Sequence, residues 1–426
     1  MTTDKYKFLS ESVIYEIFVR NYSNAGTFNE IYNDLDRIKK LGANIIWFMP
    51  LNPNGKFGKK GGHGSPYSIS DYFTINPEYG NEKQFSDICE KAHDLDMKVL
   101  IDVVFNHTSM DSVLLKSNPE WFLKDENGNF TRKFKDWNDI YDLDFSNLDL
   151  WDYLVDILKK WIDFGVDGFR CDVAPMIPLE FWKYAINKIG EYSSKSIIWL
   201  AESVHKSFIK FLRDKGFEAS SDTELHQIFD ITYDYDGFEI LQKYFSGNAL
   251  LNDYVNYLFI QETLYTKNSL KLRFLENHDC ERISSIFEGK NKLKNWSLFF
   301  MLLPGTPLIY MGQELMINKL PNLFEKNSVR WNEGDYEFLN YYKKIISISK
   351  EIKKNCKFFK TSFITNGILK IDWEGEENYT AILNLEDKSG ILETNLNISG
   401  IDLITGENFA IENIFNINKN PIILKL

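Results

Sequence analysis

Four apolar segments of the sequence end in polar or ionisable side chains. They close with Asp102-Val-Val-Phe-Asn106-His107, Arg170-Cys171-Asp172, Glu202 and Glu276-Asn277-His278-Asp279. Polar groups at the ends of apolar runs are costly unless they face a solvated opening. Their carboxylates include Asp172, Glu202 and Asp279, and glycoside hydrolysis needs one carboxyl as nucleophile or base and another as acid. If these residues meet in space, the sequence predicts a site of that kind.

Each of these groups, taken alone, has a simpler explanation. Arg170 and Asp172, two positions apart, could form a buried structural ion pair. Glu202 could favour a helix N-terminus, and residues 277–279 could form a turn. His107 could be a hydrogen-bonded histidine of the core. The joint pattern favours a functional site, because chance placement of all four groups at strand ends is improbable.

The surrounding segments alternate short apolar runs with longer amphipathic ones. Strands are expected at 12–22, 44–51, 98–105, 166–173, 196–201, 227–232, 270–275 and 307–310, and helices at 28–41, 83–95 and 148–164. Such alternation predicts parallel strands joined by helices, and about eight strands favour a closed (β/α)8 TIM barrel of the α/β class. No glycine-rich phosphate-binding loop follows the first strand, which argues against a nucleotide-binding open sheet. In the barrel, catalytic side chains lie at the C-terminal ends of the strands.

Two regions depart from this alternation. Residues 108–148 are polar and too long for a plain connection, which predicts a short inserted, irregular domain after the third strand. Segments 368–373, 379–385 and 422–426 alternate apolar and polar residues, as antiparallel strands do. The domains expected are a barrel of residues 1–107 and 149–354, the insertion at 108–148, and a C-terminal antiparallel β-sandwich at 355–426.

Composition excludes several classes of partner. The 426 residues include 49 Lys and Arg against 61 Asp and Glu, a net charge of −12, which argues against nucleic acid and anionic membranes. No apolar run is long enough to cross a membrane, and the first residues do not read as a secretory signal. The four cysteines are scattered without metal-ligand spacing. We therefore expect a cytoplasmic protein.

The motifs together resemble one family. DVVFNHT at 102–108, GFRCDVA at 168–174, WLAES around Glu202 and FLENHD at 274–279 occur in the order found in the α-amylase family, glycoside hydrolase family 13. Further matching segments are SPYSISDYFTINPEYG at 65–80, YDLDFSN at 141–147 and PGTPLIYMGQE at 304–314. The sequence resembles this family over most of its length, and the set of motifs is specific although each one alone is weak.

The resemblance implies roles for individual residues. Asp172 resembles the nucleophile that forms a covalent glycosyl-enzyme, Glu202 the general acid and then base, and Asp279 the carboxylate that stabilises the oxocarbenium-like transition state. Other positions resemble substrate-binding residues: His107 and His278 as donors to sugar hydroxyls, Tyr67 as the aromatic platform beneath the ring, and Arg170, whose charge should keep Asp172 ionised.

The same resemblance suggests a mechanism and a metal. A retaining enzyme holds its two reacting carboxyls ~5–5.5 Å apart, and like-charge repulsion is expected to raise the pKa of Glu202. The chemistry requires no cofactor. Calcium is possible, with Asn106 and Asp144 as ligands. Many calcium-dependent members have Lys-His at the positions of Pro175 and Met176 here, so a calcium-linked histidine and a substrate-contacting lysine are absent.

The expected activity is retaining hydrolysis of α-1,4-linked glucans or maltodextrins. An oligosaccharide α-glucosidase or an α-glucanotransferase would use the same three carboxylates, because only the acceptor or the cleavage position differs. A non-catalytic glucan-binding protein is disfavoured, since all three carboxylates are present. The C-terminal domain is expected to support the barrel, with glucan binding through Trp373 and Tyr379 as the alternative.

Overall fold

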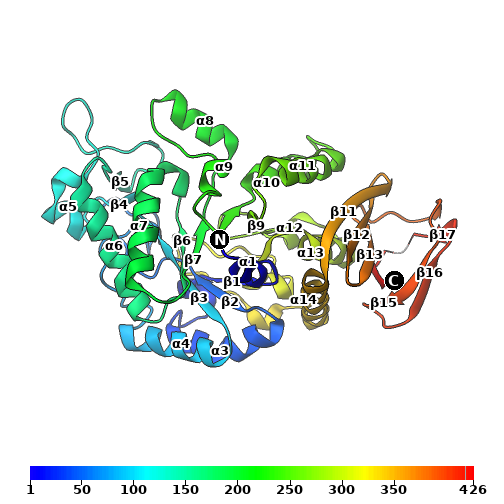
Figure 1. Cartoon of the computed structure of the whole chain (residues 1–426). Helices are drawn as coiled ribbons and strands as arrows, with labels where there is room; N and C mark the ends of the chain where they lie inside the picture. The colour runs from blue at the N-terminus through cyan, green and yellow to red at the C-terminus, as the bar shows by residue number, and fades with distance from the viewer. Residues whose placement is uncertain (418) are drawn as a thin grey trace.

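The barrel predicted from the sequence is present. The computed structural model describes residues 1–417 and 419–426, and within them eight parallel strands close in the order β1-β10-β9-β8-β7-β6-β3-β2 (Figure 1). These strands are β1 Ile14–Ile17, β2 Ile45–Phe48, β3 Lys98–Val103, β6 Gly168–Cys171, β7 Ile198–Ala201, β8 Ile231–Tyr233, β9 Leu270–Arg273 and β10 Thr306–Tyr310. Their buried side chains fill the barrel, so its interior is a packed core.

Amphipathic helices surround the strands. The longer ones are α1 Thr3–Ser10, α3 Phe28–Leu41, α4 Glu82–Asp94, α6 Leu148–Asp163, α7 Leu179–Tyr192, α8 Lys206–Asp214, α10 Tyr235–Phe245, α11 Leu251–Leu264, α13 Lys290–Leu302 and α14 Tyr336–Asn355. Short helical turns are α2 Val19–Tyr22, α5 Val113–Ser117, α9 Asp222–Leu225, α12 Ile283–Ile286, η1 Pro119–Trp121, η2 Ala174–Met176, η3 Gln313–Leu315 and η4 Trp331–Glu333. Among the described helices, none is long and apolar enough to cross a membrane.

Helix α3 shows how local sequence sets these boundaries. Thr27 and Glu30 form a capping box at its start, and Gly42 ends it with φ +110°. A Cβ at Gly42 would also lie 2.6 Å from the side chain of Ile346 on α14. The glycine thus serves both the left-handed turn and the close packing of two helices.

Every predicted barrel strand differs from the structure at one or both ends, and two of them differ most. The segment predicted at 12–22 is a strand only over β1, because the chain then turns into the buried helix α2. In the segment predicted at 227–232, β8 begins at Ile231. The residues just before it follow α9, where a Ser221–Glu224 capping box favours a helical turn.

The insertion is more ordered than the sequence suggested. Its ends pair as a two-stranded antiparallel sheet, β4 His107–Ser109 with β5 Ile140–Asp142. It leaves the barrel at the end of β3 and lies far from the C-terminal domain (Figure 1). The backbone of Leu143 donates to the Asn106 carbonyl at 2.9 Å. The insertion is therefore tied to the end of the barrel where the polar residues gather.

The C-terminal antiparallel domain is confirmed. A six-stranded sheet has the order β11-β12-β13-β18-β15-β16, and β14 pairs with β17. The strands are β11 Cys356–Thr365, β12 Ile368–Gly375, β13 Asn378–Asn384, β14 Ile391–Glu393, β15 Ile398–Asp402, β16 Asn408–Ile411, β17 Ile414–Asn416 and β18 Ile422–Lys425. Strand β11 was missed because most of its side chains are partly exposed and mixed in polarity, so clear alternation is lost.

The two aromatic residues considered for glucan binding are buried. Trp373 is 7% exposed and Tyr379 is 1% exposed. The indole of Trp373 donates to the carbonyl of Leu302 on α13 at 3.0 Å. From the other side, the indole of Trp296 donates to the Leu385 carbonyl at 3.0 Å. These two tryptophans hydrogen-bond across the contact between the β domain and the barrel, which supports a packing role for the β domain.

We expect Trp373→Phe to lower the free energy of unfolding by about 1 kcal/mol, because one buried hydrogen bond is lost. Trp373→Ala should cost about 3–5 kcal/mol through the cavity it leaves. Urea unfolding measures both. Phe358→Ala is the control, since Phe358 on β11 is 70% exposed; a cost as large as that of Trp373→Ala would contradict the docking role.

Candidate active site

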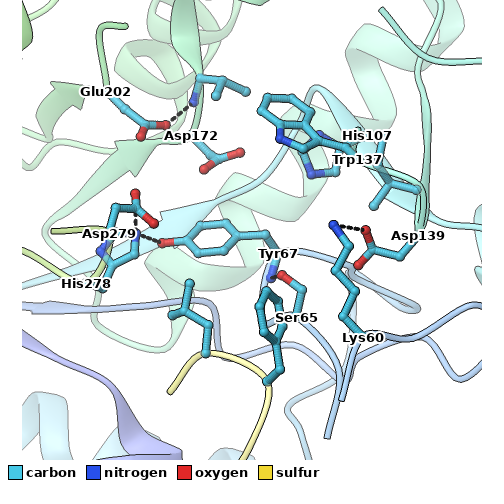
Figure 2. A pocket seen from close by; sticks show the side chains of 14 residues that line it. Lys60, Ser65, Tyr67, His107, Trp137, Asp139, Asp172, Glu202, His278 and Asp279 are labelled. Atoms are coloured by element: carbon cyan, nitrogen blue, oxygen red, sulfur yellow. Dashed lines mark hydrogen bonds and ion pairs between the residues drawn. The ribbon is translucent and has the colours of Figure 1, made fainter. Parts of the chain in front are cut away.

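The polar strand ends meet in one pocket. A cavity of about 200 Å³ lies at the C-terminal end of the barrel strands, and Figure 2 shows its lining. The predicted residues that line it are Tyr67, His107, Asp172, Glu202, His278 and Asp279. Arg170 lies fully buried beside them. The three carboxylates, distant in sequence, are therefore brought to a single hollow.

Arg170 organises the base of this pocket. Its Nη1 donates to Asp172 Oδ1 at 2.7 Å and to Asp102 Oδ1 at 2.9 Å. Its Nη2 lies 2.9 Å from Glu202 Oε1 in an ion pair. Arg170 and Asp172 share a face because they are two positions apart near the end of β6. One buried guanidinium thus holds three buried carboxyl groups, two of which open into the pocket.

This cluster has more buried carboxyl groups than cations, and the pKa values of two of these carboxyl groups are raised. Burial raises the pKa of Asp172 well above its ordinary value, and the charge of Glu202 adds to the shift. Arg170 lowers the pKa of Asp172, as expected, but burial outweighs the guanidinium, so the net direction is upward. Burial likewise raises the pKa of Asp102 to about 6. The proton belongs to the cluster rather than to one residue.

Glu202 is oriented from two sides. Besides the Arg170 ion pair, its Oε2 accepts a hydrogen bond from the Val173 amide at 2.6 Å. Val173 has φ +36°, in a region that a β-branched residue rarely adopts and that costs of order 1–3 kcal/mol. This strained backbone turns the amide just after Asp172 toward Glu202. The expected protonation of Glu202 itself stays a prediction.

The opposite wall is a chain of hydrogen bonds through His278. Its Nδ1 lies 2.5 Å from Glu16 Oε1, and its Nε2 lies 3.2 Å from Asp279 Oδ2. Burial lowers the pKa of His278, but the charges of Asp279 and Glu16 outweigh burial and raise it well above its ordinary value. Burial in turn raises the pKa of Asp279, and the imidazolium outweighs it, so the net pKa is lowered. Asp279 is thus kept ionised.

Tyr67 lies between the two walls. Its ring stacks on His278 with centroids 5.4 Å apart, and its hydroxyl donates to Asp102 Oδ2 at 3.1 Å. Across the pocket, burial lowers the pKa of His107 to about 3, so that imidazole is neutral. The ring of Trp137 lies 5.6 Å from it. Tyr67 therefore presents a fixed aromatic face to the cavity, where a sugar ring can stack.

Sequence reasoning missed several residues of this site. Glu16 could have been found, because a carboxylate in the middle of a fully buried strand is a clear signal. Asp102 was noted at a strand end but given no role. Lys60, Trp137 and Asp139 line the pocket from loops, and their contacts leave no local pattern in the sequence.

The predicted calcium ligands do not fit that ion. Asn106 Oδ1 accepts from the Lys133 ammonium at 3.0 Å, and the same ammonium donates to the Met176 carbonyl at 2.8 Å. Asp144 Oδ1 accepts from the Ser146 amide at 3.0 Å. The described residues contain no group of three or more His, Cys, Asp or Glu that could hold a metal. Calcium takes 6–8 oxygen ligands, and a lysine ammonium already occupies the Asn106 oxygen.

Comparisons with known proteins agree with this geometry. The family model of the alpha-amylase catalytic domain matches residues 18–137 and 115–361. An α-amylase structure from Lactobacillus plantarum is 39% identical with TM-score 0.93, covering 99% of this chain and 100% of that chain. A maltogenic α-amylase structure from Thermotoga neapolitana is 31% identical with TM-score 0.87, covering 98% and 99%.

More distant sequences carry related names. Alpha-amylase 2 of Dictyoglomus thermophilum is 26% identical over 93% of this chain and 73% of its own length. A 4-alpha-glucanotransferase of Thermotoga maritima is 27% identical over 71% of both chains. An intracellular maltogenic amylase of Bacillus subtilis is 25% identical over 76% of this chain and 55% of its own length.

Asp102→Asn tests whether the charge of Asp102 raises the pKa of Asp172. Asp102 raises the pKa of Asp172 by its charge and competes for Arg170, so its neutralisation should lower the pKa of Asp172. The acid-side limb of the pH–rate profile on maltodextrin should move down by about 1 pH unit. Asp230→Asn is the control, since Asp230 is buried beside Lys5, away from the pocket lining. An acid limb that stays in place would contradict the coupling.

Lys133→Met tests whether the Lys133 ammonium, rather than calcium, is the partner of the Asn106 oxygen. Losing it leaves the buried Asn106 and Met176 oxygens without a partner, which should cost about 1–3 kcal/mol of stability. Thermal unfolding measures the loss, with Lys135→Met, on an exposed side chain of the same loop, as control. Wild type should unfold at the same temperature with EDTA and with added Ca²⁺. A calcium-dependent rise for wild type would show that the metal site is real.

Proposed function

The chain belongs to the α-amylase family of glycoside hydrolases, and we propose that it hydrolyses α-1,4-linked glucans of the maltodextrin type with retention at the anomeric carbon. The observation that carries this proposal is the pairing of Asp172 and Glu202 with adjacent nitrogens of one buried guanidinium, at the wall of a pocket that also contains Asp279. Retaining hydrolysis requires one carboxylate as nucleophile and one carboxylic acid as proton donor, and we assign these roles to Asp172 and Glu202.

The first step forms a covalent intermediate. With the substrate ring stacked on Tyr67, Asp172 attacks the anomeric carbon from the face opposite the leaving group. The bond between that carbon and the glycosidic oxygen breaks, its electron pair stays on the oxygen, and Glu202 gives that oxygen its proton. Asp172 is then an ester of the sugar, and Glu202 is a carboxylate.

The second step releases the sugar. Glu202, now ionised, takes a proton from water, and the water oxygen attacks the same carbon while its bond to Asp172 breaks. Two displacements at one carbon restore the original configuration. Positive charge on the ring grows in both transition states, and Asp279, kept ionised by the His278 imidazolium, faces the same pocket as a negative charge that stabilises it.

A second candidate function is transfer to another sugar. It is favoured by the match to a 4-alpha-glucanotransferase, and it differs from hydrolysis only in whether water or a sugar hydroxyl attacks the glycosyl-enzyme. Timed products from a maltooligosaccharide ladder separate the two. Hydrolysis gives only shorter chains, whereas transfer also gives chains longer than the substrate.

We further propose that the enzyme acts in the cytoplasm. Its four cysteines are buried and unpaired among the described residues, as in a reducing compartment. A matching relative is named an intracellular maltogenic amylase. Fractionation of the source cells, with a cytoplasmic marker enzyme, checks this.

Chemical rescue by azide tests the two carboxylate roles. Asp172→Gly and Glu202→Ala should each lose about 10⁴-fold or more in kcat on an activated α-glucosyl substrate. With Asp172→Gly, azide fills the space of the nucleophile and attacks once, so the product should be a β-glycosyl azide. With Glu202→Ala, azide attacks the glycosyl-enzyme instead, and the product should be an α-glycosyl azide. NMR distinguishes the two anomers.

Asp279→Asn is the matched control, because it removes the third carboxylate but neither proposed reacting group. It should lose activity and give no azide rescue. Identical anomers from the Asp172 and Glu202 variants, or full activity in either one without azide, would overturn the assignment.

A further inference from the structure

An ion pair closes one end of the pocket, and nothing in the mechanism above uses it. Lys60 Nζ lies 3.1 Å from Asp139 Oδ1, and both side chains line the cavity. Lys60 belongs to the loop after β2, and Asp139 directly precedes β5 in the insertion. Two segments that are distant in sequence are thus joined by charge across the rim.

Asp139 is the buried member of this ion pair. The residue is 3% exposed, and its Oδ2 is buried without a hydrogen-bond partner among the residues that the structure describes. Its backbone is fixed, because the Ser68 hydroxyl donates to its carbonyl at 3.0 Å. An unpaired buried carboxylate oxygen is costly, and such groups in native proteins usually have a partner. Asp139 is therefore the fixed, buried member of the pair, and Lys60, whose side chain is 33% exposed, is the member that a bound sugar can reach.

The loop that carries Lys60 is held on both sides. The amides of Lys56 and Phe57 donate to Asp111 Oδ2 in the insertion, at 2.9 and 3.1 Å. The Gly62 amide donates to Glu325 Oε1 at 2.7 Å. The loop therefore has fixed partners on the insertion and on the segment after β10, and the Lys60–Asp139 pair belongs to a built rim.

The position of the Lys60–Asp139 pair relative to Glu202 indicates which end of the substrate this pair meets. Figure 2 shows Glu202 on one side of the site and Lys60 with Asp139 on another, with Asp172 and the Tyr67 ring between them. Glu202 protonates the glycosidic oxygen, so the leaving group lies on its side. In an α-1,4-glucan, the part of the ring remote from that bond points toward the non-reducing end of the chain.

We propose that the Lys60–Asp139 pair is an end wall that binds the hydroxyls of a non-reducing terminal sugar, so that the enzyme cleaves maltooligosaccharides from their free non-reducing ends. The ammonium of Lys60 donates to a sugar oxygen, and Asp139 holds that ammonium in place. A chain that continued past this sugar would have to displace the ion pair. This inference rests on the proposed glucan hydrolysis and adds its substrate class, short chains with free ends.

The experiment compares two substrates that differ at one end. Aryl maltoheptaoside with a free non-reducing end is matched with the same compound carrying a 4,6-ethylidene block on the terminal sugar. For wild type, kcat/KM on the free-ended substrate should exceed that on the blocked one by about tenfold or more, the loss expected for one hydrogen bond to a charged group. Asp139→Ala and Lys60→Met should bring the ratio close to one, mainly by raising KM for the free-ended substrate.

Matched controls come from the same segments. Lys56→Met lies on the same loop and Asp136→Asn precedes Asp139, and both side chains are exposed and outside the pocket lining. Both variants should keep the wild-type ratio. Hydrolysis of both substrates at equal rates by wild type would overturn the end wall while leaving glucan hydrolysis intact. Failure to cleave either substrate would instead count against the proposed function.

A folding defect does not remove the test. If Asp139→Ala unfolds, the catalytically slow Glu202→Gln protein can be titrated with the free-ended and the blocked maltoheptaoside. Binding of the free-ended compound about tenfold more tightly supports the wall, and equal binding contradicts it.

Discussion

The whole site depends on one buried guanidinium that serves three buried carboxyl groups. Arg170 contacts Asp102, Asp172 and Glu202, and its side chain is inaccessible to solvent. One buried cation faces three carboxyl groups there, and burial raises the pKa of two of them, Asp102 and Asp172. The retaining mechanism needs one carboxylate and one carboxylic acid in this group. The barrel makes it possible because β3, β6 and β7 are neighbours, with Asp102 directly opposite Arg170 in the register.

The wall formed by His278 and Asp279 also contains buried ion pairs, which here keep Asp279 ionised. Here Glu16 and Asp279 flank His278, so one imidazolium lies between two carboxylates. The result is a carboxylate, Asp279, that stays ionised close to Asp102 and Asp172, whose pKa values are raised. Tyr67 touches both sides through its hydrogen bonds to Asp102 and His278. Protonation and the placement of the sugar platform are thus linked through one side chain.

The sequence predicted the parts of the site that follow from strand position. Asp172, Glu202 and Asp279 were recognisable because each follows an apolar run, and a closed parallel barrel brings such ends together. The helix over 28–41 was predicted residue for residue, since its apolar spacing and Gly42 mark both ends. The pairing of β14 with β17 in the C-terminal domain was not predicted, because strands of only 3 residues are too short to show alternation.

Other features could not have been read from local patterns. The strained φ of Val173 depends on the packing around Glu202. Lys133 reaches Asn106 from a loop 27 positions further along the chain, so the ammonium beside the Asn106 oxygen appears only in three dimensions. The Lys60–Asp139 contact likewise joins two loops. Sequence spacing is informative where secondary structure is regular and uninformative where loops meet.

Trapping the covalent intermediate tests the central claim most directly. A 5-fluoro-α-glucosyl fluoride reacts readily at its anomeric carbon, but the ring fluorine slows release of the sugar, so the glycosyl-enzyme accumulates. After peptic digestion, mass spectrometry should find one fluoroglucosyl group, attached to Asp172 beside Arg170. A label on Glu202, Asp279 or Asp102, or steady turnover of the reagent with no labelled carboxylate, would contradict the account.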